Sequence, residues 1–184
     1  MNEQPPRVTR RRAVQIALVG GLVAAAGSAI AIVGAFLRPK AQVEPGAPRD
    51  AGRAQDFPRG GDPVHYADGK FWLANLDPSD QTSSGPAGGA GLLACSRACP
   101  HQGATVPWRP TWDVEGTKGW YRCPSHGATF TRAGVRVSGP APRNMDTMRV
   151  TVDGDGAITV YTGNITRGDA DNPKRAIQHP LLPS

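Results

Sequence analysis

The amino-acid sequence predicts a mostly β domain attached to a single N-terminal transmembrane helix. Three observations lead to this prediction. The 184 residues include 23 glycines and 18 prolines, a content typical of a chain with many turns. Short apolar runs flank Asp-Gly dipeptides, which favour β-hairpins. An uncharged, apolar segment near the N-terminus is long enough to span a membrane.

The predicted transmembrane helix covers residues 13–37, which contain no charged side chain. This length suffices to cross a bilayer with some tilt, although a buried helix of a soluble protein is the alternative. The flanks favour the membrane, because only Arg38 and Lys40 follow the segment, whereas four arginines precede it: Arg7, Arg10, Arg11 and Arg12. Since positive charges stay inside, we expect residues 1–12 in the cytoplasm and the C-terminal domain on the outer side.

The run Thr9-Arg10-Arg11-Arg12-Ala13-Val14 also resembles a twin-arginine export signal. Such a signal addresses proteins that fold around a cofactor before crossing the bacterial cytoplasmic membrane. The positively charged flank of a plain anchor is the alternative. Small residues occur throughout the segment, so it has no distinctive cleavage pattern and cleavage stays open. Both alternatives place the C-terminal domain on the periplasmic or extracellular side.

The remainder of the chain is predicted to form a tether, a β domain and a tail. Residues 38–62 are polar and lack apolar periodicity, so we expect a flexible tether. Residues 63–161 contain the apolar runs expected of the domain. Residues 162–184 are polar and contain prolines, and we expect them to add little to the core.

Turn residues divide the domain into short predicted strands. Residues 64–75 hold two apolar runs around Ala67-Asp68-Gly69-Lys70, which predicts an opening hairpin. Residues 79–90 are rich in Gly, Ser and Pro and should form a surface loop. The run Leu92-Leu93-Ala94-Cys95 is expected to be a strand. Residues 148–152 and 157–161 alternate around Asp153-Gly154-Asp155-Gly156, which predicts a closing hairpin.

The net charge of +6 is concentrated beside the anchor. Residues 1–40 contain six Lys or Arg and one acidic residue, for +5, whereas residues 41–184 contain fifteen and fourteen, for +1. The predicted domain is nearly neutral and has no basic stripe interleaved with aromatic residues. Nucleic acid is therefore not an expected partner.

Two short motifs each supply one thiol and one imidazole. They are Cys99-Pro100-His101-Gln102-Gly103 and Cys123-Pro124-Ser125-His126-Gly127. The chain has three cysteines, an odd number that does not make a disulfide framework. Cys99, His101, Cys123 and His126 are therefore the candidate metal ligands.

Four such ligands could hold a tetrahedral zinc ion or a [2Fe–2S] cluster. Zinc sites generally pair two like ligands on each arm of the chain, whereas each motif here mixes one cysteine with one histidine. A two-iron cluster can take both thiolates on one iron and both imidazoles on the other. The glycine that ends each motif lets the backbone wrap a cluster and direct N–H groups at its sulfurs. We expect one [2Fe–2S] cluster, with zinc as the alternative.

With these motifs, the chain resembles the Rieske family. Val106-Pro107-Trp108 after the first motif and Gly139-Pro140-Ala141-Pro142 after the second make it similar to the Rieske iron–sulfur subunit of cytochrome bc and bf quinol-oxidising complexes. The similarity covers roughly residues 71–161. It implies a fold of stacked antiparallel sheets, three in number, with the cluster at the tip between two loops and the proline segment shielding it.

Two positions depart from the family pattern. The bc-type motifs usually carry one more cysteine each, joined in a disulfide, and Ala104 and Ser125 stand at those positions here. That disulfide cannot form in this chain. Cys95 lies on a predicted strand and is interpreted as a buried apolar residue rather than a replacement partner. His65 and His179 lie outside the motifs and are interpreted as ordinary surface or turn residues.

The resemblance also implies a function. The family's ligand histidines expose their outer ring nitrogens, and one of them can take a quinol proton as the cluster takes the electron. For this chain we expect His126 to face the quinol, with His101 as the other exposed ligand. The implied partners are a cytochrome b subunit, a quinol and a cytochrome c-type acceptor. The chain would then be the electron-carrying subunit of a quinol:cytochrome c oxidoreductase in the membrane.

Two further residues indicate which quinol is the donor. High-potential relatives carry Ser and Tyr where this chain has Ala128 and Phe130, and those hydroxyls donate hydrogen bonds to sulfur atoms at the cluster. Their loss should lower the reduction potential, which favours menaquinol.

Three other functions are alternatives to that of a quinol-oxidising subunit. The chain could be the small Rieske subunit of a periplasmic molybdenum oxidase such as arsenite oxidase. It could also be a soluble Rieske ferredoxin or oxygenase domain, or a zinc-bound structural module.

Overall fold

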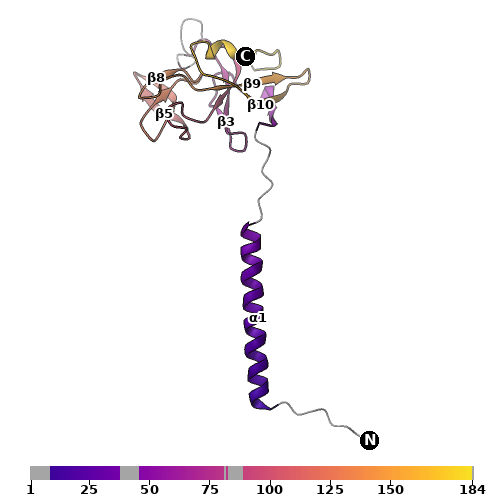
Figure 1. Cartoon of the computed structure of the whole chain (residues 1–184). Coiled ribbons are helices and arrows are strands. Elements are labelled where there is room, and N and C mark those ends of the chain that lie inside the picture. Colours follow the sequence, from indigo (N-terminus) through magenta and orange to yellow (C-terminus); the bar gives the residue numbers. More distant parts are fainter. Residues whose placement is uncertain (1–8, 38–45, 81, 83–88, 184) are drawn as a thin grey trace. The chain divides into compact units, whose positions relative to one another are not determined.

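A computed structural model of the chain describes residues 9–37, 46–80, 82 and 89–183 (Figure 1). The chain divides into two compact units, Met1–Gln42 and Val43–Ser184. The first unit contains the helix α1 (Arg10–Leu37), and the second contains the strands.

The helix α1 has the length and composition of a membrane span. Its 28 residues extend over about 42 Å at 1.5 Å per residue, and none of them is buried within the protein. The hydroxyl of Ser28 donates a 2.7 Å hydrogen bond to the carbonyl of Ala24, which satisfies this polar group inside an apolar helix. The predicted N-terminal apolar helix is confirmed, and it fits a single-pass membrane anchor.

The second unit is mostly β, as predicted, and its described strands form two antiparallel sheets. The larger sheet has the order β1-β10-β9-β4-β3-β2 and the smaller has the order β5-β6-β7-β8. Figure 1 shows β5 and β8 on one side of this unit and β9 and β10 on the other. The strands are β1 (Pro48–Arg53), β2 (Val64–Tyr66), β3 (Phe71–Leu76), β4 (Gly91–Ser96), β5 (Trp108–Val114), β6 (Thr117–Arg122), β7 (Thr129–Phe130), β8 (Arg136–Ser138), β9 (Thr147–Val152) and β10 (Ala157–Thr166).

The larger sheet is continuous from β1 to β2, whereas the family resemblance implied three separate sheets. The connection is a short ladder between β4 and β9, in which Ala94 lies opposite Met148 and Cys95 lies opposite Thr147. Because this ladder is hydrogen-bonded, β1, β10 and β9 continue into β4, β3 and β2. The described strands therefore form two sheets and not three.

The central strands β3 and β4 are buried on both faces of the larger sheet. Leu73, Leu92 and Ala94 belong to one apolar cluster, which also contains residues of β9 and β10. Leu93 and Cys95 belong to a second cluster, which contains residues of the smaller sheet. Successive side chains on a strand point to opposite faces, so a continuous apolar run such as residues 92–95 fills two cores.

The predicted hairpins and the central strand are confirmed. Strands β2 and β3 pair around the turn at residues 67–70, with Val64 opposite Leu73. Strands β9 and β10 pair around residues 153–156. In that turn the Asp153 carboxylate accepts the N–H groups of Asp155 and Ala157, which is the local bonding that makes Asp a turn residue.

The predicted tether is wrong from residue 48 onward. Residues 48–53 form β1 at the edge of the larger sheet, where Pro48 lies opposite Tyr161 of β10. Ala51, Ala54 and Phe57 are buried. An edge strand is held mainly by backbone hydrogen bonds to its neighbour, so it needs few apolar side chains and leaves little pattern in the sequence. Residues 38–45 of the expected tether lie outside the described residues.

The predicted polar tail is also wrong, because residues after 161 complete the core. Strand β10 continues to Thr166, and the short helix η3 (Asn172–Arg175) follows. Asn172 is fully buried, and its amide donates to the carbonyl oxygens of Ala133 and Met145 at 3.3 and 2.8 Å. A polar side chain that satisfies buried backbone groups belongs in a core, although its hydropathy suggests the surface.

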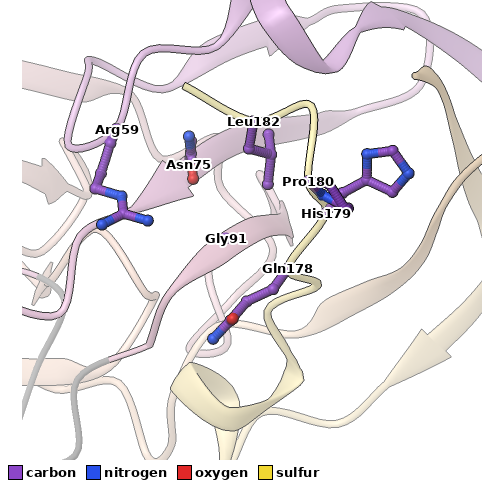
Figure 2. Close-up of a pocket in the computed structure, with 7 residues that line it drawn as sticks. All are labelled: Arg59, Asn75, Gly91, Gln178, His179, Pro180 and Leu182. Atoms are coloured by element: carbon purple, nitrogen blue, oxygen red, sulfur yellow. The ribbon is translucent and has the colours of Figure 1, made fainter. Parts of the chain in front are cut away.

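The chain that follows η3 crosses the start of β4. Ile177 and Leu92 exchange two backbone hydrogen bonds of 2.8 Å. A Cβ atom on Gly91 would lie 2.2 Å from the Ile177 carbonyl oxygen, so this crossing requires glycine. Gln178, Pro180 and Leu182 line a cavity of about 310 Å³ together with Gly91 and Asn75. Figure 2 labels these residues.

Candidate metal centre

The first Cys/His motif is a tight turn between β4 and β5. The Cys99 N–H donates to the Ala104 carbonyl at 2.8 Å, and the Gly103 N–H donates to the Cys99 carbonyl at 2.8 Å. Gly103 has φ +74°, in the left-handed region that glycine adopts without strain. These bonds fix the path of the chain around His101.

The second motif repeats this turn between β6 and β7. The Cys123 N–H donates to the Ala128 carbonyl at 2.8 Å, and the Gly127 N–H donates to the Cys123 carbonyl at 3.0 Å. Gly127 also has φ +74°. The two turns are thus equivalent from cysteine to glycine, but His101 is two residues after its cysteine and His126 is three residues after its own.

The structure places the four candidate ligands in two like pairs. The Cys123 thiol lies near enough to the Cys99 thiol to contribute to the rise of its pKa, and both residues are buried in one cluster. The His101 and His126 rings meet edge to face, with centroids 4.9 Å apart and planes at 78°. The structure therefore presents one sulfur pair and one nitrogen pair.

Two backbone N–H groups lie near the Cys99 sulfur. Burial raises the pKa of the Cys99 thiol, and the backbone N–H groups of His101 and Gln102 oppose this shift by hydrogen bonding to it. Metal ligation requires the thiolate, and N–H groups aimed at sulfur stabilise that charged form. Within the described residues, no three His, Cys, Asp or Glu form a group that would hold one metal ion.

The proline segment covers the second motif. A Cβ atom on Gly139 would lie 2.5 Å from the Ala128 Cα atom, so residue 139 must be glycine for the two segments to approach. Ala141 is buried in the same cluster as Cys99 and Cys123. His101 is half-buried and His126 is exposed. The site is therefore closed on its thiol side and open on its imidazole side.

Two sets of side-chain hydrogen bonds brace the motifs, and the residues that make them were not identified from the sequence. The Trp72 indole donates to the Val106 carbonyl at 2.9 Å and supports the chain leaving the first motif. Arg122 donates to the Thr129 hydroxyl at 3.3 Å, and that hydroxyl donates to the Gly127 carbonyl at 3.1 Å. The position of Arg122 directly before Cys123 was the available signal for this second brace.

No disulfide links the two motifs. Cys95, Cys99 and Cys123 are all free cysteines. At the two positions where the family resemblance implies further cysteines, Ser125 is exposed and Ala104 is half-buried. Ala104 packs against the core cluster that contains Cys99 and Cys123. Apolar packing and the internal hydrogen bonds of each turn hold these loops in place of a covalent link.

Cys95 is a buried core residue, as predicted. It is 1% exposed, and burial, followed in size by the charge of Asp146, raises its pKa to about 12. A Cβ atom on Gly134 would lie 3.0 Å from its sulfur, so the thiol is tightly packed. A protonated, enclosed thiol is a poor ligand and a poor nucleophile.

We expect the Cys95→Ala variant to keep its full cluster signal. It should lose about 1 kcal/mol of stability, because one buried sulfur is removed. Cys95→Ser is the matched comparison, and it should be less stable still, since it buries a hydroxyl at a cost of about 1–3 kcal/mol. Electron paramagnetic resonance and urea unfolding measure the two effects. Loss of the signal in Cys95→Ala would make Cys95 a ligand.

The two remaining histidines lie away from the motifs. His65 is exposed on β2 and its ring lies 4.5 Å from that of Trp72. Partial burial, and then the charge of Arg97, lower its pKa. The Nδ1 atom of His179 accepts the Leu181 N–H at 3.3 Å, which is a turn contact. Both interpretations, surface and turn, are confirmed.

A β domain with two equivalent turns that pair two thiols and two imidazoles defines a metal- or cluster-binding protein. The family model described as "Rieske [2Fe-2S] domain" matches residues 51–153, more than half of the chain. The chain therefore belongs to the Rieske family, and its cofactor is one Rieske-type [2Fe–2S] cluster.

Several relatives are iron–sulfur subunits of cytochrome complexes. The chain is 27% identical over 169 residues to the cytochrome b6-f complex iron-sulfur subunit 2 of Cyanophora paradoxa, covering 85% of this chain and 65% of that protein. It is 37% identical over 57 residues to the corresponding subunit of Synechococcus, covering 31% and 30%. The match to the Chlorobaculum tepidum subunit is 28% identical over 153 residues, covering 82% and 74%.

The chain spans less than two thirds of the length of the first two relatives. Among solved structures, the plasma membrane Rieske protein of Synechocystis PCC 6803 is 24% identical, with a TM-score of 0.39, covering 61% of this chain and 97% of that protein.

Proposed function

We propose that this protein is a membrane-anchored electron carrier that takes one electron from a quinol and passes it to a c-type cytochrome. The observation that carries the proposal is the pairing of His101 with the exposed His126, from two turns whose cysteines are buried. The relatives named as cytochrome b6-f iron–sulfur subunits support the same role. The bound cluster would accept and release one electron at a time.

In this proposal, Cys99 and Cys123 bind one iron, and His101 and His126 bind the other. The like pairing of their side chains supports this assignment. Each imidazole uses one ring nitrogen for iron, so its other nitrogen is free to exchange a proton with solvent or substrate. His126 is the more exposed of the two and is therefore assigned to the quinol.

The donor is proposed to be menaquinol. Ala128 and Phe130 are both buried and carry no hydroxyl group, so neither side chain can donate a hydrogen bond to sulfur. A reduced cluster carries more negative charge, and donors at its sulfurs stabilise it. A cluster that lacks these two hydrogen-bond donors is harder to reduce. It therefore favours a quinol of lower potential as the electron donor.

The membrane arrangement follows from the sequence around α1. Arg10, Arg11 and Arg12 form the first turn of the helix, and we infer that this end stays in the cytoplasm. The twin-arginine run is assigned to export of the folded domain. A tether preceding β1 would let the domain move between the quinol and its acceptor.

Co-purification of the full chain from mild detergent tests this function. We expect a cytochrome b subunit in the purified complex and reduction of the cluster by a menaquinol analogue, followed by electron paramagnetic resonance. The Cys123→Ala variant is the cluster-free control. A molybdenum-containing partner without cytochrome b would instead support the small subunit of a molybdenum oxidase, and a purified complex that no quinol reduces would contradict the proposal.

A further inference from the structure

A groove lined by two arginines and a tryptophan lies beside the second motif. Five residues line this cavity of about 380 Å³: Arg109, Thr111, Trp112, Arg122 and Pro124. We call it the arginine groove. Pro124 follows Cys123 directly, so the groove begins at the cluster site.

An irregularity in the hairpin of β5 and β6 opens this groove. Arg109 lies opposite Trp120 and Asp113 lies opposite Lys118, so residues 110–112 on β5 face the single residue Gly119 on β6. Extra residues on one strand form a bulge, which redirects side chains away from the sheet. Trp112 consequently stands 41% exposed, whereas Trp108 and Trp120 are buried.

The groove carries positive charge without an internal counter-ion. The Arg122 guanidinium lies over the Trp112 ring, 4.1 Å from its centroid. In the part of the chain that the structure describes, no carboxylate forms an ion pair with Arg109 or Arg122. Asp113, the acidic residue next to Trp112, is engaged in the hairpin turn, where it accepts the Gly116 N–H at 2.8 Å.

Arg122 links the groove to the second motif. A Cβ atom on Gly127, next to the candidate ligand His126, would lie 3.4 Å from the Arg122 Nη2 atom. A protein that placed carboxylates on Arg109 and Arg122 would therefore approach the exposed imidazole side of the site. Exposed, oriented guanidinium groups bind carboxylates and guide charged partners in solution.

We propose that the arginine groove is a docking surface for an acidic face of the redox protein that receives the electron. The inference rests on the proposed function as an electron carrier, and it adds where the acceptor binds. Trp112 supplies apolar contact area and orients Arg122, and the two guanidinium groups pair with carboxylates of the acceptor. One electron leaves this chain and reduces the acceptor by one electron.

Binding is tested on the full chain in detergent, with 5-fluorotryptophan at all four tryptophans and hexaglutamate as the probe. We expect hexaglutamate to shift the fluorine signal of Trp112 and to leave those of Trp72, Trp108 and Trp120 in place. Changing both Arg109→Gln and Arg122→Gln should weaken binding by about tenfold, which is 1.4 kcal/mol. Added salt should weaken binding to the wild type.

Arg149→Gln is the matched control. Arg149 is exposed, as Arg109 is, and it lies over an aromatic ring, as Arg122 does: its guanidinium is 5.3 Å from the Tyr161 ring. It belongs to the other sheet. The control should bind hexaglutamate as the wild type does. Equal weakening in Arg149→Gln, or no shift of the Trp112 signal, would overturn the proposal. Inorganic phosphate is the competing probe, added at the same concentration of negative charge. If it saturated the Trp112 signal and displaced hexaglutamate, the groove would be a small-anion site instead.

Electron transfer provides the second measurement. The reduced full chain is mixed with an acidic c-type cytochrome, and the Arg109→Gln, Arg122→Gln variant should react about tenfold more slowly at low salt. Arg109→Gln alone, which leaves the Arg122 brace of the second motif in place, should also react more slowly, with an unchanged reduction potential. If the electron-transfer rate fell only in variants whose reduction potential had also changed, Arg122 would act on the cluster and not on docking. Peptide binding needs no quinol, so it would persist if the quinol assignment failed.

Discussion

Alanine in place of Cys99, His101, Cys123 or His126 is expected to abolish the cluster signal in each of the four variants. Each substitution leaves an iron with an open position and a turn without its link to the other motif. The variants should also unfold at lower temperature, by about 2–4 °C for each kcal/mol lost in a domain of this size. Electron paramagnetic resonance and analysis of iron, sulfide and zinc measure occupancy.

Ser125→Ala is the matched control for the ligand variants. Ser125 is exposed in the second motif between Cys123 and His126, and its side chain is assigned no ligand role. This variant should retain the full signal and the same iron content. A ligand variant that kept its cluster, or a wild-type protein that contained zinc in place of iron and sulfide, would contradict the assignment.

The reduction potential of the wild-type domain is expected to be low, and the double variant Ala128→Ser, Phe130→Tyr is expected to raise it. Two hydrogen bonds of roughly 1–2 kcal/mol each correspond to a shift on the order of a tenth of a volt, since a tenfold one-electron change is about 59 mV. Redox titration of the full chain measures this shift.

In the structure, the added hydroxyls would lie inside the packed site and not in solvent. Both residues are buried, and Gly139 lies against Ala128 without a Cβ atom. Ala133→Ser is the matched control, because Ala133 is a buried alanine of the same cluster but lies outside the motifs. It should leave the potential unchanged. A wild-type potential already in the ubiquinol-oxidising range, with no rise in the double variant, would contradict the menaquinol assignment.

Because β1 begins at Pro48, a deletion beyond that residue does not test domain movement. A deletion within residues 47–51 would remove part of β1, whose Asp50 lies opposite Thr159 of β10. Slower turnover after such a deletion would report damage to the larger sheet and not a shorter tether. Variants that test the tether should lengthen or shorten the chain before Pro48, where β1 begins.

The sequence by itself determined the anchor, the hairpins and the cluster motifs. A charge-free segment, alternation around an Asp-Gly turn and a Cys/His motif ending in glycine are all local, so each is readable without knowing what packs against it. The absence of a disulfide between Ala104 and Ser125 is likewise decided by residue type alone.

Only the tertiary structure decided which distant segments complete the domain. Strand β1 is held by backbone bonds to β10, and Asn172 is buried because it satisfies the carbonyl oxygens of Ala133 and Met145. The pairing of thiol with thiol and imidazole with imidazole, and the bulge that exposes Trp112 beside Arg122, also arise from register between strands. Such contacts depend on partners far away in the chain, and hydrogen bonds to those partners leave no periodic pattern in the sequence.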